Sequence, residues 1–398
     1  MLSLCMIVKN EKNNLTKYLS QIKNFFEEII IIDTGSTDQT IKIAKTFTNK
    51  VFSFKWCDDF SKAKNYAISK ATKKWILFLD ADELITNEDL KKIKEAINQN
   101  TDAHRIQSVD AYKTQNVDAY RINVINYLNQ KVQGAKTNID QTFNHPFQVS
   151  FKLTRLFKNK NYLYKYRVHE LIEESIEEQN GTIKELNVNI HHFGTLNLQN
   201  KKNDYYEQLV LKQLKELPNN KRALYYAGKV YLSKKNYDKT IELFNQITKI
   251  DPAYKNIHAK IGQLYFIKKE LNKAINHYKQ SLKCIEDNDQ NTNNNQNEDN
   301  NQKSNNNQKT DLINQKAHLI NQLAFLYHKN GQNELSKYLL EEFLKNNELN
   351  KETIALLKLN LNRLKWHPLK VLANPLTFVA HLWRVSKPGK FLKSQRDY

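Results

Sequence analysis

The sequence predicts an α/β domain with a parallel, doubly wound sheet, followed by an all-α domain of helical repeats. In roughly the first 80 residues, short apolar runs alternate with stretches of helical periodicity, which is the pattern of parallel strands joined by crossover helices. After about residue 200 the strand signals end and similar residues recur at a constant spacing. The 398 residues, 40% of them hydrophobic, are enough for two or three globular domains.

Four apolar runs are predicted to be the strands of the first domain. Leu2–Val8 has no basic leader and is too short for a signal peptide, so we interpret it as the first strand. Glu28–Asp33 contains four consecutive isoleucines, which favour a strand, and Val51–Trp56 is the third run. Trp75–Leu79 is apolar throughout, which is typical of a strand buried on both faces. Helical spacing of apolar residues lies between the runs, at 15–26, 39–47 and 58–72.

Acidic residues follow two of these strands at the point where each ends. Asp33 ends the second strand, and Asp80 and Asp82 follow the fourth. If the strand geometry continues past Leu79, the last two carboxylates point the same way, at the edge of a parallel sheet where ligands bind. Oxygen ligands without a neighbouring cysteine suit Mg²⁺ or Mn²⁺ that also holds phosphate and water. The alternative is that the acidic strand end caps the next helix, and the D-x-D pattern alone does not decide between them.

Missing motifs exclude several functional classes. The sequence has no G-x-G-x-x-G and no G-K-[ST], so it carries neither a dinucleotide fingerprint nor a P-loop. Its cysteines, Cys5, Cys57 and Cys284, are too widely spaced for a zinc site or a disulfide framework. No segment approaches the roughly 18 to 20 apolar residues that span a bilayer, so we expect the catalytic region in the cytoplasm. We interpret the acids as binding a nucleotide diphosphate through a bridging metal.

Four motifs, in this order, resemble those of family 2 glycosyltransferases of the Rossmann-like GT-A fold. They are M-I-V-K-N-E at 6–11, I-D-T-G-S-T-D-Q-T at 32–40, D-D-F-S-K-A-K-N at 58–65 and W-I-L-F-L-D-A-D-E at 75–83. The resemblance implies a nucleotide-sugar donor, usually a uridine diphosphate sugar, a divalent metal, and inversion at the anomeric carbon in a single displacement.

The same resemblance implies roles for individual residues. Asp80 and Asp82 would bind the metal, and Lys64 would contact the diphosphate where many relatives carry arginine. A lysine keeps the charge of that arginine but loses its bidentate fork. The residues that would line the nucleoside pocket are Val8, Asn10, Glu11 and Asp33.

Three later motifs, R-L-F at 155–157, V-H-E at 168–170 and H-F-G at 192–194, resemble the closing part of this domain in a bacterial subgroup that includes bacteriocin peptide S-glycosyltransferases. Glu170 is the candidate base that takes a proton from the acceptor, and Asp82 is the second candidate catalytic residue. His192 is the candidate for a further metal or diphosphate contact, and His191 is the less favoured of the adjacent pair. A structural role for either histidine stays open.

The second domain is predicted from a repeat of 34 residues, the length of a tetratricopeptide repeat. This spacing separates Gly228 from Gly262, Tyr231 from Tyr265, Thr240 from Ala274, and Ile241 from Ile275. A third copy, at Ala324, Tyr327 and Ser336, is displaced by a further 62 residues, which is one repeat plus an insert of 28. We expect each copy to be a pair of helices that stacks on its neighbours.

The predicted domain boundaries follow from these patterns. Residues 287–311 have no apolar side chain and are predicted to be a disordered insert, because they have nothing to bury. The predicted order is the α/β domain at 1–200, repeats at 201–286, the insert at 287–311, a repeat continuation at 312–365 and a basic aromatic tail at 366–398.

The positive charge and the repeats indicate the kinds of partner. The net charge of +20 lies mostly in residues 201–398, which hold 34 Lys and Arg against 19 Asp and Glu. Such a balance attracts acidic partners, but a Lys-rich composition explains it more simply, and we expect no nucleic acid. The tail either contacts the inner face of a membrane peripherally or packs on the last repeat. The repeats either bind a peptide or form a scaffold or homodimer surface.

Two classes of function remain open. One is a metal-dependent inverting glycosyltransferase that acts on a peptide held by the repeats, or on a lipid-linked or cell-surface glycan. The other is a non-catalytic repeat adaptor. The complete acidic set at the predicted sheet edge, together with Glu170 and His192, favours the enzyme, because an adaptor has no chemical need for it.

Overall fold

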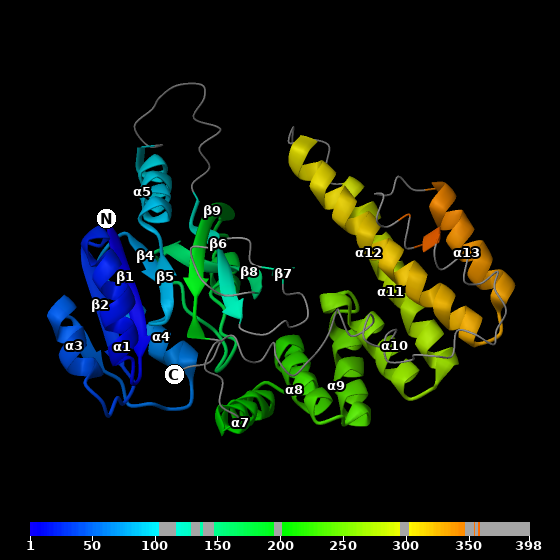
Figure 1. Cartoon of the computed structure of the whole chain (residues 1–398), viewed down its shortest axis with the longest axis horizontal. Coiled ribbons are helices and arrows are strands. Elements are labelled where there is room, and N and C mark those ends of the chain that lie inside the picture. The colour runs from blue at the N-terminus through cyan, green and yellow to red at the C-terminus, as the bar shows by residue number, and fades with distance from the viewer. Residues whose placement is uncertain are drawn as a thin grey trace. The chain divides into compact units, whose positions relative to one another are not determined.

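The chain folds into two compact units in a computed structural model, one formed by Met1–Glu216 and a second that begins at Leu217 (Figure 1). The structure describes residues 1–102, 117–128, 136–137, 147–194, 201–294, 302–346, 354, 357 and 358. The predicted tail at 366–398 lies outside the described residues.

The described part of the first unit contains one mixed sheet of nine strands, in the order β3-β2-β1-β4-β8-β6-β9-β5 with β7 beside β8. The strands are β1 Leu2–Val8, β2 Glu28–Asp33, β3 Val51–Ser53, β4 Trp75–Phe78, β5 Glu83–Ile85, β6 Ala119–Leu128, β7 Lys136–Thr137, β8 Phe147–Lys158 and β9 Ile183–His192. The helices are α1 Lys12–Asn14, α2 Ser20–Ile22, α3 Thr40–Phe47, α4 Phe60–Lys70, α5 Asn87–Asp102, α6 Glu173–Glu177 and α7 Lys201–Glu216. A π-helical turn at Leu15–Leu19 joins α1 to α2, and a 3-10 turn at Lys23–Phe25 follows.

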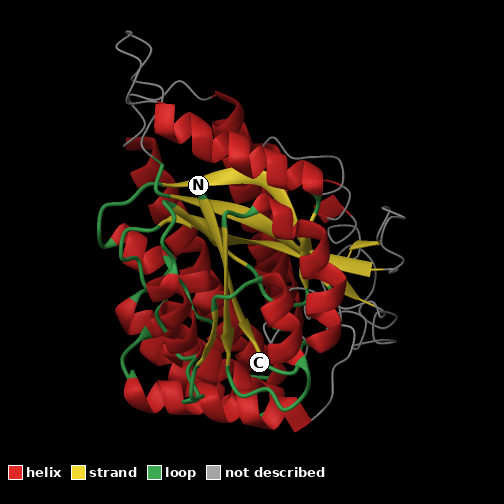
Figure 2. Cartoon of the chain, turned by 90° about the vertical axis from the view of Figure 1, so that its left-hand side faces the viewer, coloured by secondary structure: helices red, strands yellow, loops and turns green. Residues whose placement is uncertain are grey.

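The first four strands confirm the predicted parallel sheet. β1 pairs in parallel with both β2 and β4, and β2 pairs in parallel with β3. The register places Val8 opposite Asp33, so the loops after β1 and β2 leave the sheet side by side. The second half is different, because β8 is antiparallel to both β4 and β6. Figure 2 shows the strands changing direction across the sheet, as expected from its twist.

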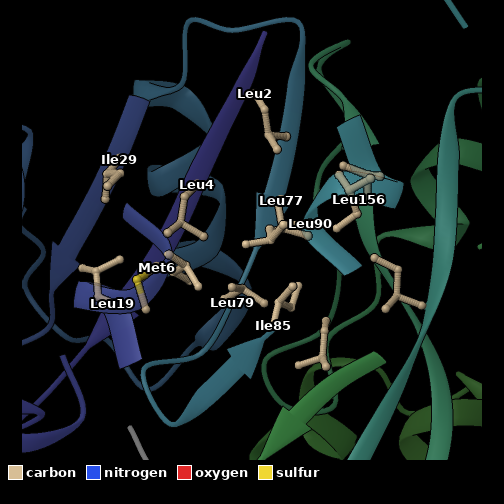
Figure 3. Close-up of a cluster of buried hydrophobic side chains, with 14 of the residues drawn as sticks. Leu2, Leu4, Met6, Leu19, Ile29, Leu77, Leu79, Ile85, Leu90 and Leu156 are labelled. Atoms are coloured by element: carbon tan, nitrogen blue, oxygen red, sulfur yellow. The ribbon is translucent and has the colours of Figure 1, made fainter. Parts of the chain in front are cut away.

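The core of this unit forms where the apolar runs are longest. All seven residues of β1 and all four of β4 are buried, so these central strands have helices or loops on both faces. Figure 3 shows Leu4, Leu77 and Leu156 from three adjacent strands in one buried cluster with side chains of the flanking helices. This packing fixes the carboxyl ends of β1, β2 and β4 at one edge.

The second unit contains helical hairpins, which confirms the predicted all-α part. The described helices are α8 Lys221–Ser233, α9 Tyr237–Ile250, α10 Ile257–Ile267, α11 Leu271–Asn294, α12 Gln302–Lys329 and α13 Asn333–Asn346. They pack as the pairs α8/α9, α10/α11 and α12/α13. Within these pairs, a side chain on Gly228 would overlap the ring of Phe244, and a side chain on Gly262 would overlap the ring of Tyr278. Both the glycines and the rings that they contact are 34 residues apart.

A hydrogen bond repeats as well. Thr240 donates its hydroxyl to the carbonyl of Gly228 (3.3 Å), and Ser336 donates to that of Ala324 (2.6 Å). These residues are equivalent in the predicted first and third copies, so the structure has the register that the sequence spacing predicts.

Two boundaries differ from the expectation. The first unit continues through Glu216, so α7 belongs to the sheet domain. Contacts of α7 agree with this assignment, because Gln213 accepts a hydrogen bond from the N–H of Val168 and Glu216 accepts one from Arg167. The second difference is in the predicted insert, where 287–294 end α11 and 302–311 begin α12. Backbone hydrogen bonds within a helix need no apolar side chain, so these residues extend the flanking helices.

Among the described helices, none is both long and apolar enough to cross a membrane.

Candidate active site

The loops after β1 and β2 are joined by hydrogen bonds between main chain and side chain. The backbone N–H of Asn10 donates to Oγ of Ser36 (2.9 Å), and Oδ1 of Asn10 accepts from the N–H of Thr37 (2.8 Å). Glu11 donates its N–H to Oγ1 of Thr40 (2.7 Å). Together with the pairing of Val8 and Asp33, these bonds bring the four predicted nucleoside residues to one edge of the sheet.

Asp33 shapes the turn that follows β2. Its carboxylate accepts from the N–H groups of Gly35 (3.0 Å) and Ser36 (3.1 Å), and Gly35 has a φ of +106°. A residue with a side chain is strained at that angle, so glycine is required for the turn. Each carboxylate oxygen has a second lone pair, and Asp33 therefore has capacity for a ligand besides the turn.

Asp80 lies at the centre of a buried ion cluster after β4. Nη2 of Arg155 is 3.1 Å from Asp80 and 2.8 Å from Glu83, and Nζ of Lys64 is 3.9 Å from Asp80. The N–H of Asp80 donates to Glu83 (2.8 Å). Burial raises the pKa of Glu83 to about 7, although Arg155 acts in the opposite direction. Two carboxylates therefore share one guanidinium in a site with little water.

Asp82 faces His192 instead. Nε2 of His192 is 3.2 Å from Oδ2 of Asp82, and Nδ1 hydrogen-bonds to Oδ1 of Asn126 on β6. Burial disfavours the charged imidazolium, but Asp82 outweighs it and raises the pKa of His192 to about 9. Gly194 permits this approach, because a Cβ there would lie 1.7 Å from Oδ2 of Asp82 and 2.9 Å from Nε2 of His192.

The three predicted metal ligands do not converge as one set. In the described part of the chain, no group of three or more His, Cys, Asp or Glu side chains is placed to hold a metal ion. Strand β4 ends at Phe78, before the D-x-D sequence, so Asp80 and Asp82 turn to different partners. Asp82 and His192 do fit a divalent ion as a pair, because adjacent ligands of an octahedral Mg²⁺ are about 3 Å apart. The amide oxygen behind His192 is the outer partner that metal-binding histidines usually have.

Glu170 and Lys64 form an ion pair beside this cluster. Nζ of Lys64 is 2.7 Å from Oε1 of Glu170; Lys64 is buried, and the side chain of Glu170 is 10% exposed. The ammonium also lies over the rings of Phe78 (4.9 Å) and Tyr164 (5.1 Å). Lys64 therefore links the candidate base to the acidic cluster at Asp80. His191 lies apart from these groups, with Nδ1 2.8 Å from the hydroxyl of Tyr127.

Sequence reasoning missed three residues of the site: Glu83, Asn126 and Arg155. The signal for Arg155 was the R-L-F motif, in which a charge stands between apolar residues of a buried strand. Glu83 was visible as the last letter of W-I-L-F-L-D-A-D-E. Asn126 gave no signal, because only the pairing of β6 with β9 brings it opposite His192.

The arrangement suits a polyanionic ligand that carries a metal. Lys64 and Arg155 supply buried positive charge, and Asp82 with His192 supplies ligands for a cation. Asp80 and Asp82 follow the carboxyl end of the parallel strand β4, where ligands bind in open α/β sheets. A nucleotide diphosphate with a divalent ion has this charge pattern.

Comparison with known proteins agrees with this chemistry. Residues 3–158 match the model of glycosyl transferase family 2. A TPR repeat-containing protein of Synechococcus elongatus is 43% identical over 97 residues, 24% of this chain and 24% of that protein. The SPbeta prophage-derived glycosyltransferase SunS of Bacillus subtilis is 43% identical over 90 residues, 22% of this chain and 21% of SunS. Each match spans about a quarter or less of the relative's length.

A solved structure of S. aureus TarS 1-349 in complex with UDP-GlcNAc aligns with 70% of this chain and 89% of that one, at 14% identity and a TM-score of 0.38. The family match, in contrast, extends from β1 to β8 and includes the D-x-D sequence, whereas Glu170 and His192 lie beyond it. The amino-terminal part of this chain is a family 2 glycosyltransferase domain.

Proposed function

We propose that the chain is an inverting glycosyltransferase that moves a sugar from a nucleotide diphosphate sugar, with uridine diphosphate as carrier, to a peptide or glycan acceptor. The observation that supports this most is the buried cluster of opposite charges beyond β4, in a domain of family 2. Burying charges is unfavourable unless they are paired, and buried clusters of charges with shifted pKa values concentrate at functional sites. An adaptor protein would gain nothing from them.

The residues around the cluster have separate roles in this proposal. The loops around Asn10 and Asp33 hold the nucleoside, and Lys64 contacts the diphosphate. Asp82 and His192 hold Mg²⁺ or Mn²⁺, of which Mn²⁺ accepts an imidazole ligand more readily. The bound ion would neutralise the charge that develops on the leaving diphosphate.

Glu170 acts as the base in this proposal. It takes the proton from the acceptor nucleophile as that atom attacks the anomeric carbon, on the face opposite the leaving diphosphate. The bond to the nucleophile forms while the bond to the diphosphate oxygen breaks, so the configuration inverts. Lys64 lies between Glu170 and Asp80, so the donor's diphosphate competes with Glu170 for its ammonium.

The acceptor is proposed to be recognised by the helical hairpins, since stacked repeats commonly bind extended peptides. A lipid-linked or cell-surface glycan is the alternative acceptor within the same reaction.

The test is an assay of UDP release from a panel of uridine diphosphate sugars, with Mn²⁺ and a cytosolic peptide extract, followed by mass spectrometry of the peptides. We expect release with at least one donor and a sugar-sized mass increase on a peptide. The Asp82→Asn variant is the matched inactive control. The adaptor function is correct instead if the wild type consumes no donor, with or without extract, and captures the same peptides from the extract as the Asp82→Asn variant does.

A further inference from the structure

The loop that carries Glu170 is closed at its base. Lys165 and Leu171 exchange two backbone hydrogen bonds, of 2.8 and 3.1 Å, so Tyr166–Glu170 forms a five-residue loop. Tyr166 and His169 have positive φ angles of 76° and 53°. Residues with side chains adopt this conformation only where surrounding contacts hold it. The loop therefore depends on the elements that pack against it.

Helix α7 supplies contacts to three successive residues of the loop. They join Arg167 to Glu216 (2.5 and 3.1 Å), the N–H of Val168 to Oε1 of Gln213 (3.0 Å), and the ring of His169 to the hydroxyl of Tyr206 (3.2 Å). The next residue in the chain is Glu170. The helix thus touches the loop at the three positions directly before the candidate base.

Among the side chains of α7 that the structure describes, the buried polar groups lie where the helix meets this loop. Leu209 and Val210 are buried in the middle of the helix, whereas Gln213 is buried at 1% exposure. A buried amide is unfavourable unless it forms hydrogen bonds; this one accepts from the main chain of Val168 through Oε1, while its Nε2 has no partner among the described residues. An apolar side chain would fill the position at lower cost if packing were its only purpose.

Helix α4 holds the other side of the same loop. The N–H of Phe60 donates to the carbonyl of Arg167 (2.9 Å), and the amide of Asn65 bonds to both backbone groups of Tyr164 (2.7 and 2.9 Å). Lys64, the residue before Asn65, pairs with Glu170. The loop is therefore fixed between α4, which carries its ionic partner, and α7, which carries no predicted site residue.

We propose that α7 is a positioning element for glycosyl transfer, and that Tyr206, Gln213 and Glu216 hold the loop Tyr166–Glu170 so that Glu170 meets the acceptor. The proposal rests on the proposed function, in which Glu170 is the base. The three α7 residues touch no substrate and act through the loop. A base that is displaced by about 1 Å loses much of its effect, roughly 10²-fold in rate.

The test uses a double variant of the full-length chain, Tyr206→Phe with Gln213→Met. The substitutions remove the hydroxyl that contacts His169 and the amide oxygen that accepts from Val168, but keep the size of both side chains. Gln208→Met is the matched control, because Gln208 lies on the exposed face of the same helix. We expect the double variant to lower kcat for transfer by about 10- to 100-fold, with KM for the donor and the affinity for UDP unchanged. Gln208→Met should equal the wild type.

A double-mutant cycle with Glu170→Gln separates positioning from general damage. If α7 acts through Glu170, adding Tyr206→Phe and Gln213→Met to Glu170→Gln should lower kcat no further. If α7 has a merely structural role, the two substitutions should lower kcat by the same factor as they do in the wild type. Hydrogen exchange supplies a readout without activity, since the amides of 166–171 should exchange faster in the double variant while those of β1 and β4 do not change.

The outcomes are distinguishable. Non-additive loss of transfer with faster local exchange supports the proposal. Faster exchange with unchanged kcat, or losses that multiply, overturns it and leaves the proposed function intact. Absence of transfer by the wild type with every donor overturns the proposed function and this proposal with it.

Discussion

Glu28 and Glu83 are both buried glutamates of one sheet, at opposite ends of its parallel strands, and their surroundings differ. Glu28 begins β2 and accepts from Oγ of Ser3 (2.5 Å) and from Thr72 (2.8 Å), with Lys50 as its ionic partner. Burial acts against these bonds, but together they lower the pKa of Glu28 to about 2. At the other end, burial outweighs Arg155 and raises the pKa of Glu83 to about 7.

The difference separates a structural acid from acids of a reactive site. Glu28 has enough donors to be fully satisfied as an anion, so it holds β2, the loop before β4 and Lys50 together. Glu83 shares the single guanidinium of Arg155 with Asp80, so the two carboxylates are not both neutralised as Glu28 is. Such a cluster suits a ligand of variable charge. Variants at the two ends of the sheet should therefore fail in different ways.

The largest effect is expected at Asp82. Asp82→Ala should lower transfer below detection and abolish metal-dependent donor binding, because Asp82 is, in the proposed function, a carboxylate ligand of an ion next to the leaving diphosphate. UDP release and isothermal titration with Mn²⁺ measure the two effects. Full turnover by the variant, or by the wild type in excess chelator, would show that no metal acts there.

Glu170→Gln should have the next largest effect. We expect transfer to fall by roughly 10² to 10⁴, the usual contribution of a positioned base, with the affinity for UDP retained. The control is to measure the UDP dissociation constant of the variant in the same preparation, which should equal that of the wild type. A parallel loss of donor affinity would assign Glu170 to the diphosphate, together with Lys64.

At the other end of the sheet, Glu28→Gln should reduce stability and leave kcat of the folded protein unchanged. Losing the charge at a buried, hydrogen-bonded carboxylate should reduce the free energy of unfolding by about 1–3 kcal/mol. Denaturant unfolding measures it, and a fall in kcat at equal folded fraction would contradict the structural role.

The pH dependence of unfolding sharpens this prediction. Folding lowers the pKa of Glu28 from 4.5 to about 2, so its contribution is complete above about pH 5 and is lost as the pH falls toward 2. The wild type should lose stability more steeply than Glu28→Gln over that range. Parallel curves for the two proteins would exclude the contribution.

The smallest effect is expected from deleting residues 287–311. They lack apolar side chains, so their removal should change stability by no more than about 0.5 kcal/mol, a shift of about 1–2 °C in Tm. Donor hydrolysis should also be unchanged. Aggregation of the deletion variant would show that the helical extensions of α11 and α12 belong to the packed array.

The sequence predicted local features of the fold well. The bounds of β1 and β2 agree with the prediction to the residue, because each apolar run stops at a charged residue, Lys9 after β1 and Asp33 at the end of β2. The repeat register was predictable since it depends on spacing alone. The mixed half of the sheet was not, because pairings such as Glu83 with His192 join residues far apart in sequence. Only those pairings bring Asn126 and Arg155 to the site, so motif reading could not place them.

The end of the first unit at Glu216 also has a consequence for domain exchange between relatives. Residues 201–216 belong, by their contacts, to the catalytic half, although their sequence looks like the first helix of the repeats. A truncation at residue 204 would remove Tyr206, Gln213 and Glu216 along with the array, whereas one after Glu216 keeps them. Chimaeras that graft a new acceptor-binding array should therefore be joined at Leu217, because a junction one helix earlier would replace the transferase's own α7 with that of another protein.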